Sequence, residues 1–437
     1  MRRGPLPAIV FAGCAGEPGA VLLETQTPSL RERTSIIARQ PERILTVERA
    51  VEEPGVFDTI EAAARDRWLV GYLGYGLRTH VETLPDRNPS LVPFPDLWLG
   101  IYPGLWCYDH LRGVWRVEGR PPPLPEPATP PAAMKSRARL VPVMPKEDYV
   151  QAVKRAQAYI TAGDIYQVNL TQPFRVEPIA DPWELYLALG RVQPVPYAAF
   201  LCLGAERCLL SGSPELFLRR RGARVTTRPM KGTAPRGRGP REDRIRRREL
   251  RASAKDRAEN VMIVDLMRHD LGKVAAVGSV RVANLFTVEG YRTLFQMTSK
   301  IQATLREGVG VAGLLRAVFP PGSVTGTPKK RACEIIEQLE CYRRSVYTGA
   351  IGLIAPSGDL TLSVAIRTVA VAHDRGLFGV GGAILADSDP EAEYRECLVK
   401  AQALLRALGI GAGAEPGQLA EAVGDLPSLP DGGRTHQ

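Results

Sequence analysis

Two pairs of acidic residues recur at the same spacing in segments that lie far apart along the chain. Asp256 and Glu259 stand three residues apart in KDRAEN, and Glu393 and Glu396 do so in EAEYREC. Both segments have a helical pattern, and residues three apart share one face of a helix. Carboxylates from two converging helices would form a hard-oxygen site suited to Mg²⁺. Spacing alone leaves a second interpretation open, in which both pairs lie on solvated helix faces.

A single lysine lies in a stretch of glycines and prolines. Lys231 belongs to RPMKGTAPRG, and it follows the strand-like run ARVTT, so we expect it on a loop just past a strand. A lysine on a loop is commonly a solvated charge, whereas a desolvated lysine can act as a nucleophile. The local pattern leaves both interpretations open.

Two charged residues stand in apolar, strand-like runs, Glu215 in SGSPELFL and Arg367 in the strand SVAIRTVAV. A carboxylate at the start of a strand is either a general acid with a raised pKa or a solvated group. An arginine within a buried strand needs an anionic partner, either a bound anion or a structural carboxylate.

Two glycine-rich turns could bind anions. The segments FPPGSVTGTPKKR (319–331) and GVGGAI (379–384) can present backbone N–H groups to carboxylates or phosphates, or they can be plain turns. The pattern GxxxxGK[ST] is absent, which excludes a nucleotide-binding P-loop.

Strand-like and helix-like segments occur in consecutive runs rather than in strict alternation. The expected strands are 167–177, 208–220, 223–229, 349–356, 360–372 and 376–386, and the expected helices are 144–164, 255–272, 327–340 and 389–408. Such runs favour an α+β fold, a layered α/β/β/α sandwich with two mostly antiparallel sheets and outer helices.

One proline-rich segment divides the chain. Seven prolines lie between residues 121 and 131, which predicts a linker or surface excursion over 119–143. We therefore expect an N-terminal region (1–118), a larger domain (144–408) and a flexible tail (409–437).

Composition excludes several classes of protein. The net charge is +10, and eight arginines lie between residues 236 and 251. Acidic residues are mixed among these arginines and no aromatic residue is present there, so we expect no nucleic-acid binding.

No apolar run is long enough to span a membrane. The start, MRRGPLPAIVFAGC, imitates a signal peptide, but prolines interrupt it. Seven scattered cysteines without a CxxC pair indicate reduced thiols and a cytoplasmic protein.

Taken in order, seven segments resemble the chorismate-utilising enzyme family, which includes anthranilate synthase component I, aminodeoxychorismate synthase component I, and isochorismate and salicylate synthases. The segments are SGSPELFL, RPMKGTAPRG, DRAENVMIVDLMRHDLG, FPPGSVTGTPKKRACEII, YTGAIG, SVAIRTV and GVGGAILADSDPEAEYRECLVKA. The resemblance is dense over residues 145–405 and loose over the first 115. It implies that 144–408 is a chorismate-binding catalytic domain and that 1–118 is similar to the N-terminal region of anthranilate synthase component I.

Three positions distinguish the branches of this family. PMKGT is similar to the PIKGT of aminodeoxychorismate synthases, whereas anthranilate synthases have alanine where Lys231 stands. Gln167 takes the place of the lysine that activates water in isochorismate and salicylate synthases, and Gln296 takes the place of a histidine common in anthranilate synthases. Met230 and Ala234 depart from the family pattern. The resemblance thus favours aminodeoxychorismate synthase component I, which commits chorismate to p-aminobenzoate and folate, with anthranilate synthase component I as the alternative.

The resemblance also implies roles for the residues above. Lys231 would attack C2 of chorismate as a nucleophile, and Glu215 would protonate the departing C4 hydroxyl. Mg²⁺ would be held by Glu259, Glu396, Asp256 and Glu393. The substrate would contact Arg367, Tyr347, Gly381, Gly382, Lys400, Ser323, Gln167 and Thr233.

No glutaminase domain is visible in the sequence, so the resemblance implies a glutamine amidotransferase partner that supplies ammonia. The segment VLLET (21–25) is similar to a segment that lines a tryptophan pocket in some family members.

Overall fold

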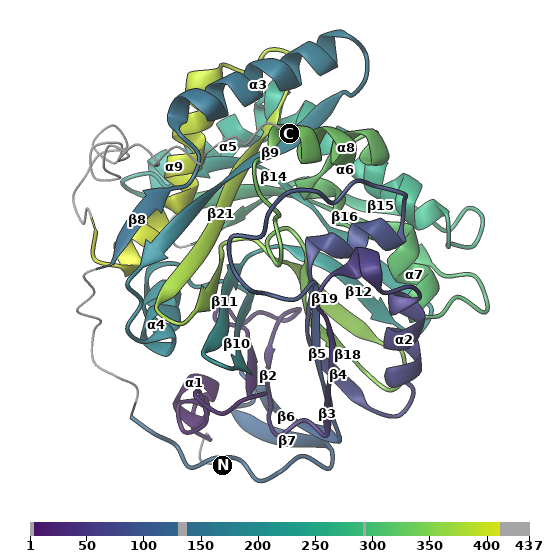
Figure 1. Cartoon of the computed structure of the whole chain (residues 1–437), viewed down its shortest axis with the longest axis vertical. Helices are drawn as coiled ribbons and strands as arrows, with labels where there is room; N and C mark the ends of the chain where they lie inside the picture. Colours follow the sequence, from purple (N-terminus) through teal and green to yellow (C-terminus); the bar gives the residue numbers. More distant parts are fainter. Residues whose placement is uncertain (1–3, 130–137, 292–293, 411–437) are drawn as a thin grey trace, which may run out of the picture.

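Two large sheets form the centre of the molecule (Figure 1). The computed structural model describes residues 4–129, 138–291 and 294–410. Within these residues the strands form one sheet of 11 strands and one of 10, and their pairings are antiparallel.

The 11-stranded sheet is built from both halves of the chain. Its order is β17 (Gly326–Thr327), β9 (Gln167–Glu177), β21 (Arg375–Ile384), β20 (Thr368–Ala372), β11 (Arg207–Ser213), β10 (Tyr197–Gly204), β1 (Val21–Glu24), β2 (Thr34–Ala38), β6 (Gly104–Asp109) and β7 (Val114–Gly119), with β8 (Arg139–Pro142) beside β9.

The 10-stranded sheet combines the two halves in the same way. Its order is β14 (Met230–Pro235), β16 (Leu294–Thr304), β13 (Arg224–Arg228), β12 (Leu216–Arg221), β19 (Leu360–Val364), β18 (Ala350–Ile354), β4 (Trp68–Leu73), β5 (Leu97–Tyr102) and β3 (Arg43–Val47), with β15 (Arg281–Gly290) beside β16.

The helices lie outside the sheets. They are α1 (Pro7–Phe11), α2 (Val56–Ala63), α3 (Lys146–Thr161), α4 (Pro182–Val192), α5 (Pro240–Ala252), α6 (Ala254–Gly272), α7 (Val311–Val318), α8 (Lys329–Leu339) and α9 (Pro390–Ala407), with short 3₁₀ turns η1 (Ala50–Glu52), η2 (Tyr75–His80) and η3 (Gly322–Val324).

Three large apolar cores hold these layers together, because each sheet buries both of its faces. The first core joins the 11-stranded sheet to α1, α3, α4, α8 and α9. The second joins the 10-stranded sheet to α2, α6 and α7. The third lies between the two sheets and includes Val21, Tyr72, Leu209 and Ile351. Figure 1 shows α4 and α9 on one side of the molecule and α2 and α7 on the other. The predicted α/β/β/α sandwich is confirmed.

Three local predictions need correction. Lys231 lies within strand β14 rather than on a loop, because β14 pairs with β16. The run 208–220 is split into β11 and β12, which belong to different sheets. The run 360–372 is likewise split into β19 and β20, so Arg367 lies between two strands and not inside one.

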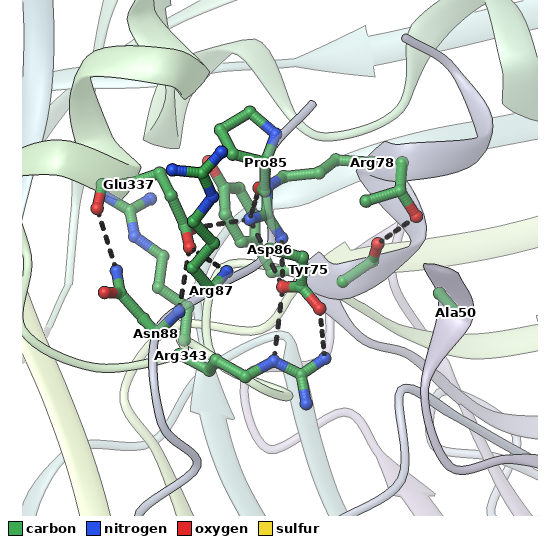
Figure 2. Close-up of polar contacts among 12 residues, drawn as sticks. Ala50, Tyr75, Arg78, Pro85, Asp86, Arg87, Asn88, Glu337 and Arg343 are labelled. Carbon is green, nitrogen blue, oxygen red and sulfur yellow. Dashed lines mark hydrogen bonds and ion pairs between the residues drawn. The ribbon is translucent and has the colours of Figure 1, made fainter. Parts of the chain in front are cut away.

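The N-terminal residues are tied to the second half of the chain. Besides supplying strands to both sheets, they form a polar cluster with α8 and the segment after it (Figure 2). Asp86 lies between Arg78 and Arg343, and Glu337 accepts hydrogen bonds from the backbone N–H groups of Arg87 and Asn88 at 2.6 and 3.0 Å. These contacts hold the loop before β5 against the C-terminal half.

The predicted linker and tail fall partly outside the described residues. Residues 120–129 contain no helix or strand, whereas 139–142 form β8. Residues 130–137 and 411–437 lie outside the structure that is described. Within the described residues, no helix is both long and apolar enough to cross a membrane.

Candidate active site

Two neighbouring crossovers between the sheets form the corner on which the site is built. Glu215 lies where the chain passes from β11 to β12, and Arg367 lies where it passes from β19 to β20. The crossovers run side by side, because Val364 N–H donates to the Glu215 carbonyl and Gly212 N–H donates to the Arg367 carbonyl, both at 3.0 Å. Arg367 has φ of 52°, a left-handed conformation, at the end of its crossover just before β20. The sheet topology thus brings a carboxylic acid and a guanidinium together.

Glu215 is buried, with 4% of its surface exposed. Burial raises its pKa to about 7, while hydrogen bonds from the Ser323 hydroxyl and the Met230 N–H, and the charges of Lys231 and Arg367, act in the opposite direction. The carboxyl group is therefore divided between its protonated and charged forms near neutral pH, which suits a general acid.

Arg367 lacks an ion-pair partner among the described residues. Burial lowers its pKa to about 10, and the nearby groups that favour its charged form are Tyr291 and Glu215. An arginine stays charged at this pKa, so its guanidinium is available to bind an anion in the site.

Lys231 is partly buried in β14 and faces charges of both signs. Burial lowers its pKa, and the ammonium group of Lys400 acts in the same direction. Glu259, Glu215 and Glu396 oppose this shift. The net shift increases the fraction of the neutral amine, which is the nucleophilic form.

The two acidic pairs come from α6 and α9, as predicted. Ser253 caps α6 and Asp389 caps α9 with side-chain hydrogen bonds, so both helices begin just before the acidic pairs. Burial raises the pKa of Glu259. Glu396 forms a 2.6 Å ion pair with Lys400, which lowers its pKa. The charges of Glu259 and Glu396 both act on the pKa of Lys231, and the charge of Glu396 also raises the pKa of Glu259. Helices α6 and α9 therefore converge on the lysine.

Glycines of β21 form the wall beside α9. Lys400 donates to the Gly381 carbonyl at 2.7 Å. A Cβ atom on Gly382 would lie 3.0 Å from Glu393 Oε2 and 3.5 Å from Glu396 Oε1, so the carboxylates reach the strand only because this residue has no side chain. Glu393 accepts a 2.7 Å hydrogen bond from Ser388 at Oε1.

Three further residues predicted for the site lie on different elements. Tyr347 packs over Gly379 of β21. A Cβ atom on Gly379 would lie only 2.4 Å from the Tyr347 ring. Gln167 is buried on β9, and its Oε1 atom has no hydrogen-bond partner among the described residues. Thr233 is exposed on β14 opposite Gln296, so the structure does not bring it to the charged groups around Lys231.

Comparisons with known proteins show to which family the chain belongs. The family model of the chorismate binding enzymes matches residues 20–406. The chain belongs to this family. Aminodeoxychorismate synthase component 1 of Escherichia coli is 39% identical over 353 residues, which cover 78% of this chain and 76% of that protein. Anthranilate synthase component 1 of Thermus thermophilus is 40% identical over 360 residues, which cover 78% of this chain and 77% of that protein.

Solved structures show the same fold. Anthranilate synthase component I from Streptococcus pneumoniae aligns with a TM-score of 0.77 at 25% identity, covering 86% of this chain and 93% of that one. The menaquinone-specific isochorismate synthase MenF from Escherichia coli aligns with a TM-score of 0.75 at 17% identity, and the alignment covers 93% of this chain and 92% of that one. The expected family and fold class are therefore confirmed.

The acidic cluster fits the Mg²⁺ that the family resemblance implies. Its donors are hard carboxylate oxygens, and Glu393 Oε2 is buried without a hydrogen-bond partner among the described residues. Within those residues no three His, Cys, Asp or Glu side chains are already grouped at metal-binding distances. Mg²⁺ needs only one or two carboxylates, because it retains water and binds oxygens of an anionic substrate.

Sequence analysis missed two charged or polar neighbours of the site. Lys255, one residue before Asp256, lowers the pKa of Glu259 and Glu396 through its positive charge. Its position four residues before Glu259 was a usable signal. Tyr291 lies beside Arg367 in space but 76 residues from it in sequence, so no local pattern could have found it.

A separate hollow of about 580 Å³ lies between η2, α6 and α8. None of the predicted site residues lines it. Its basic side chains are occupied by carboxylates, as in the Lys329–Asp270 contact at 2.5 Å and the Arg78–Glu337 contact at 2.7 Å.

Proposed function

We propose that this family member is the chorismate-aminating component of an aminodeoxychorismate synthase. It would convert chorismate and ammonia to 4-amino-4-deoxychorismate, the precursor of p-aminobenzoate and folate. The observation that carries this proposal is the position of Lys231, where the charges of Glu215, Glu259 and Glu396 all act on its amine. Aminodeoxychorismate synthase relatives from several organisms support the assignment.

Lys231 supplies the nucleophile in this proposal. Its neutral amine attacks C2 of chorismate and forms a C–N bond, the ring double bonds shift, and the C4 hydroxyl departs. Ammonia then adds at C4, the double bonds shift back, and the lysine amine leaves C2. Burial and the charge of Lys400 favour the neutral amine that the first step requires.

Glu215 supplies the proton for the departing C4 hydroxyl. A hydroxide ion is a poor leaving group, so a positioned acid lowers the barrier. With a pKa of about 7, Glu215 retains its proton in a large fraction of molecules at neutral pH. A solvated glutamate, with a pKa near 4.3, would be almost entirely charged.

The two carboxylates of chorismate would be bound at opposite ends of the site. Arg367 and Tyr347 would hold one carboxylate, together with backbone groups of Gly381. Glu259 and Glu396 would hold Mg²⁺, with Asp256 and Glu393 supporting them. When bound, the ion would neutralise the second carboxylate and orient the ring. Ser323 and Gln167 would contact the ring between these ends.

The ammonia would come from a glutamine amidotransferase subunit. No glutaminase motif is visible in the sequence, and the relatives named "component 1" carry a name that implies a second subunit. Free ammonium at high concentration should replace the subunit in an assay.

One assay tests the proposal. Purified protein with chorismate, Mg²⁺ and ammonium should form aminodeoxychorismate, which an added lyase converts to p-aminobenzoate. The alternative is anthranilate synthase component I, since the Thermus thermophilus relative is 40% identical over 360 residues. Fluorescent anthranilate as the main product would establish that alternative and refute the proposal.

A further inference from the structure

A fully buried ion pair lies behind the site. The side chains of Arg344 and Glu340 are each 1% exposed. The guanidinium donates to both carboxylate oxygens, from Nε to Oε2 at 2.8 Å and from Nη2 to Oε1 at 2.6 Å. A buried pair of this kind costs desolvation free energy, so it is a weak means of stabilising a fold and invites a functional explanation.

The remaining donors and acceptors of this pair contact two walls of the site. Arg344 Nη1 donates to the Val324 carbonyl at 2.7 Å, and Nη2 donates to the Asn169 carbonyl at 2.6 Å. Glu340 Oε1 accepts from the backbone N–H and the hydroxyl of Thr171 at 2.9 and 2.8 Å. One planar guanidinium therefore connects the η3 turn to strand β9.

Both contacted segments touch residues that act in the proposed reaction. Val324 follows Ser323, whose hydroxyl donates to Glu215. Thr171 is the strand partner of Gly381, in the pairing of β9 with β21. The Tyr75 ring lies 4.9 Å from the Arg344 guanidinium and covers one of its faces.

We propose that Arg344 is a positioning residue, which holds the Ser323 hydroxyl on Glu215 by fixing the carbonyl of Val324. It acts through this turn and does not touch the substrate. This inference rests on the proposed role of Glu215 as the acid, but it does not depend on which product is formed.

A lysine at position 344 would keep the positive charge but lose the planar fork. Its ammonium group is a single point on a flexible stem and cannot contact Glu340, Val324 and Asn169 in the same arrangement. The η3 turn would then be free to move away from Glu215. A misplacement of about 1 Å in a catalytic group reduces the rate about 10²-fold.

Arg344→Lys is therefore expected to lower kcat/KM about 10²-fold. It should also move the high-pH limb of the pH profile of kcat/KM, where activity falls as Glu215 loses its proton, to higher pH. The Ser323 hydrogen bond lowers the pKa of Glu215, and the other groups facing that carboxyl, the Met230 N–H, Lys231 and Arg367, stay in place. Loss of the bond raises the pKa, so the protonated, active form persists to higher pH. Ser323→Ala should shift this limb equally.

Arg343→Lys is the matched control. Arg343 is the neighbouring arginine, but its ion pairs are with Asp86 (Figure 2) and Asp96, and neither residue belongs to the η3 turn. This variant should keep the wild-type pH limb whatever it does to thermal stability. Glu340→Gln serves as a second variant if Arg344→Lys does not fold, and it should shift the limb in the same direction.

The double variant Arg344→Lys/Ser323→Ala decides the inference. If Arg344 acts through Ser323, the double variant shows the shift of one single variant and not the sum of two. An unshifted limb in Arg344→Lys, or additive shifts, would overturn the proposal. The limb can be followed with whichever product the wild-type protein forms, so a failure here is distinguishable from a failure of the proposed function.

Discussion

Replacing the proposed acid should make the protein less active and, at alkaline pH, more stable. Glu215→Gln keeps the size and the hydrogen-bonding carbonyl of the side chain but removes both its proton and its charge. General acid catalysis contributes typically about 10²–10⁴-fold to a rate, so kcat should fall within that range. The high-pH limb of the activity profile, where activity falls as Glu215 loses its proton, should vanish as well.

The gain in stability follows from the raised pKa. Burial raises the pKa of Glu215 from 4.5 to about 7, so the folded chain holds the proton more tightly than the unfolded chain does. The stabilisation from this bound proton is complete below pH 4.5 and is lost as the pH rises through 7. Such a shift corresponds to about 3 kcal/mol at pH 8, since one pKa unit is about 1.4 kcal/mol. Glutamine has no charge to desolvate and avoids this loss.

Thermal unfolding at two pH values measures the effect. The unfolding entropy of 437 residues is about 0.9 kcal/mol/K, so the variant should melt about 3 °C above wild type at pH 8. Well below pH 4.5, where the wild-type group is protonated in both the folded and the unfolded state, the two proteins should melt together. Equal melting temperatures at pH 8, or a variant with wild-type activity, would refute the account of Glu215 as a buried acid.

The fold could be predicted largely from local patterns. Consecutive strand-like runs, with helices of clear apolar spacing, indicated antiparallel sheets covered by outer helices, and the structure has that arrangement. The sequence could not show that the runs 208–220 and 360–372 each pass from one sheet to the other. Both runs are apolar on either side of the crossover, because each flanking strand is buried in a sheet that is covered on both faces.

The site was harder to predict, because its geometry depends on contacts between distant segments. The spacing of the acidic pairs located Glu259 and Glu396 on helix faces, but their convergence on Lys231 arises from the packing of α6 and α9 around β14 and β21. Arg344 carries no sequence signal of its own, since its neighbour Arg343 looks equivalent in the sequence. Only the structure separates an arginine that contacts the η3 turn from one that does not.

The remaining predictions concern the nucleophile and the glycines of β21. Lys231→Ala should abolish the covalent chorismate adduct, and mass spectrometry of the trapped protein checks this; an adduct that persists would identify another nucleophile. Gly382→Ala should weaken Mg²⁺ activation, because its Cβ atom would lie 3.0 Å from Glu393 Oε2, and the Mg²⁺ concentration for half-maximal activity measures the effect. Gly379→Ala should act on the substrate instead. Its Cβ atom would lie 2.4 Å from the Tyr347 ring, closer than any carbon contact allows, so the ring must turn away from the carboxylate that it is proposed to bind. The KM for chorismate should then rise several-fold while half-maximal Mg²⁺ activation stays unchanged, and the opposite pattern would place Tyr347 at the metal end of the site.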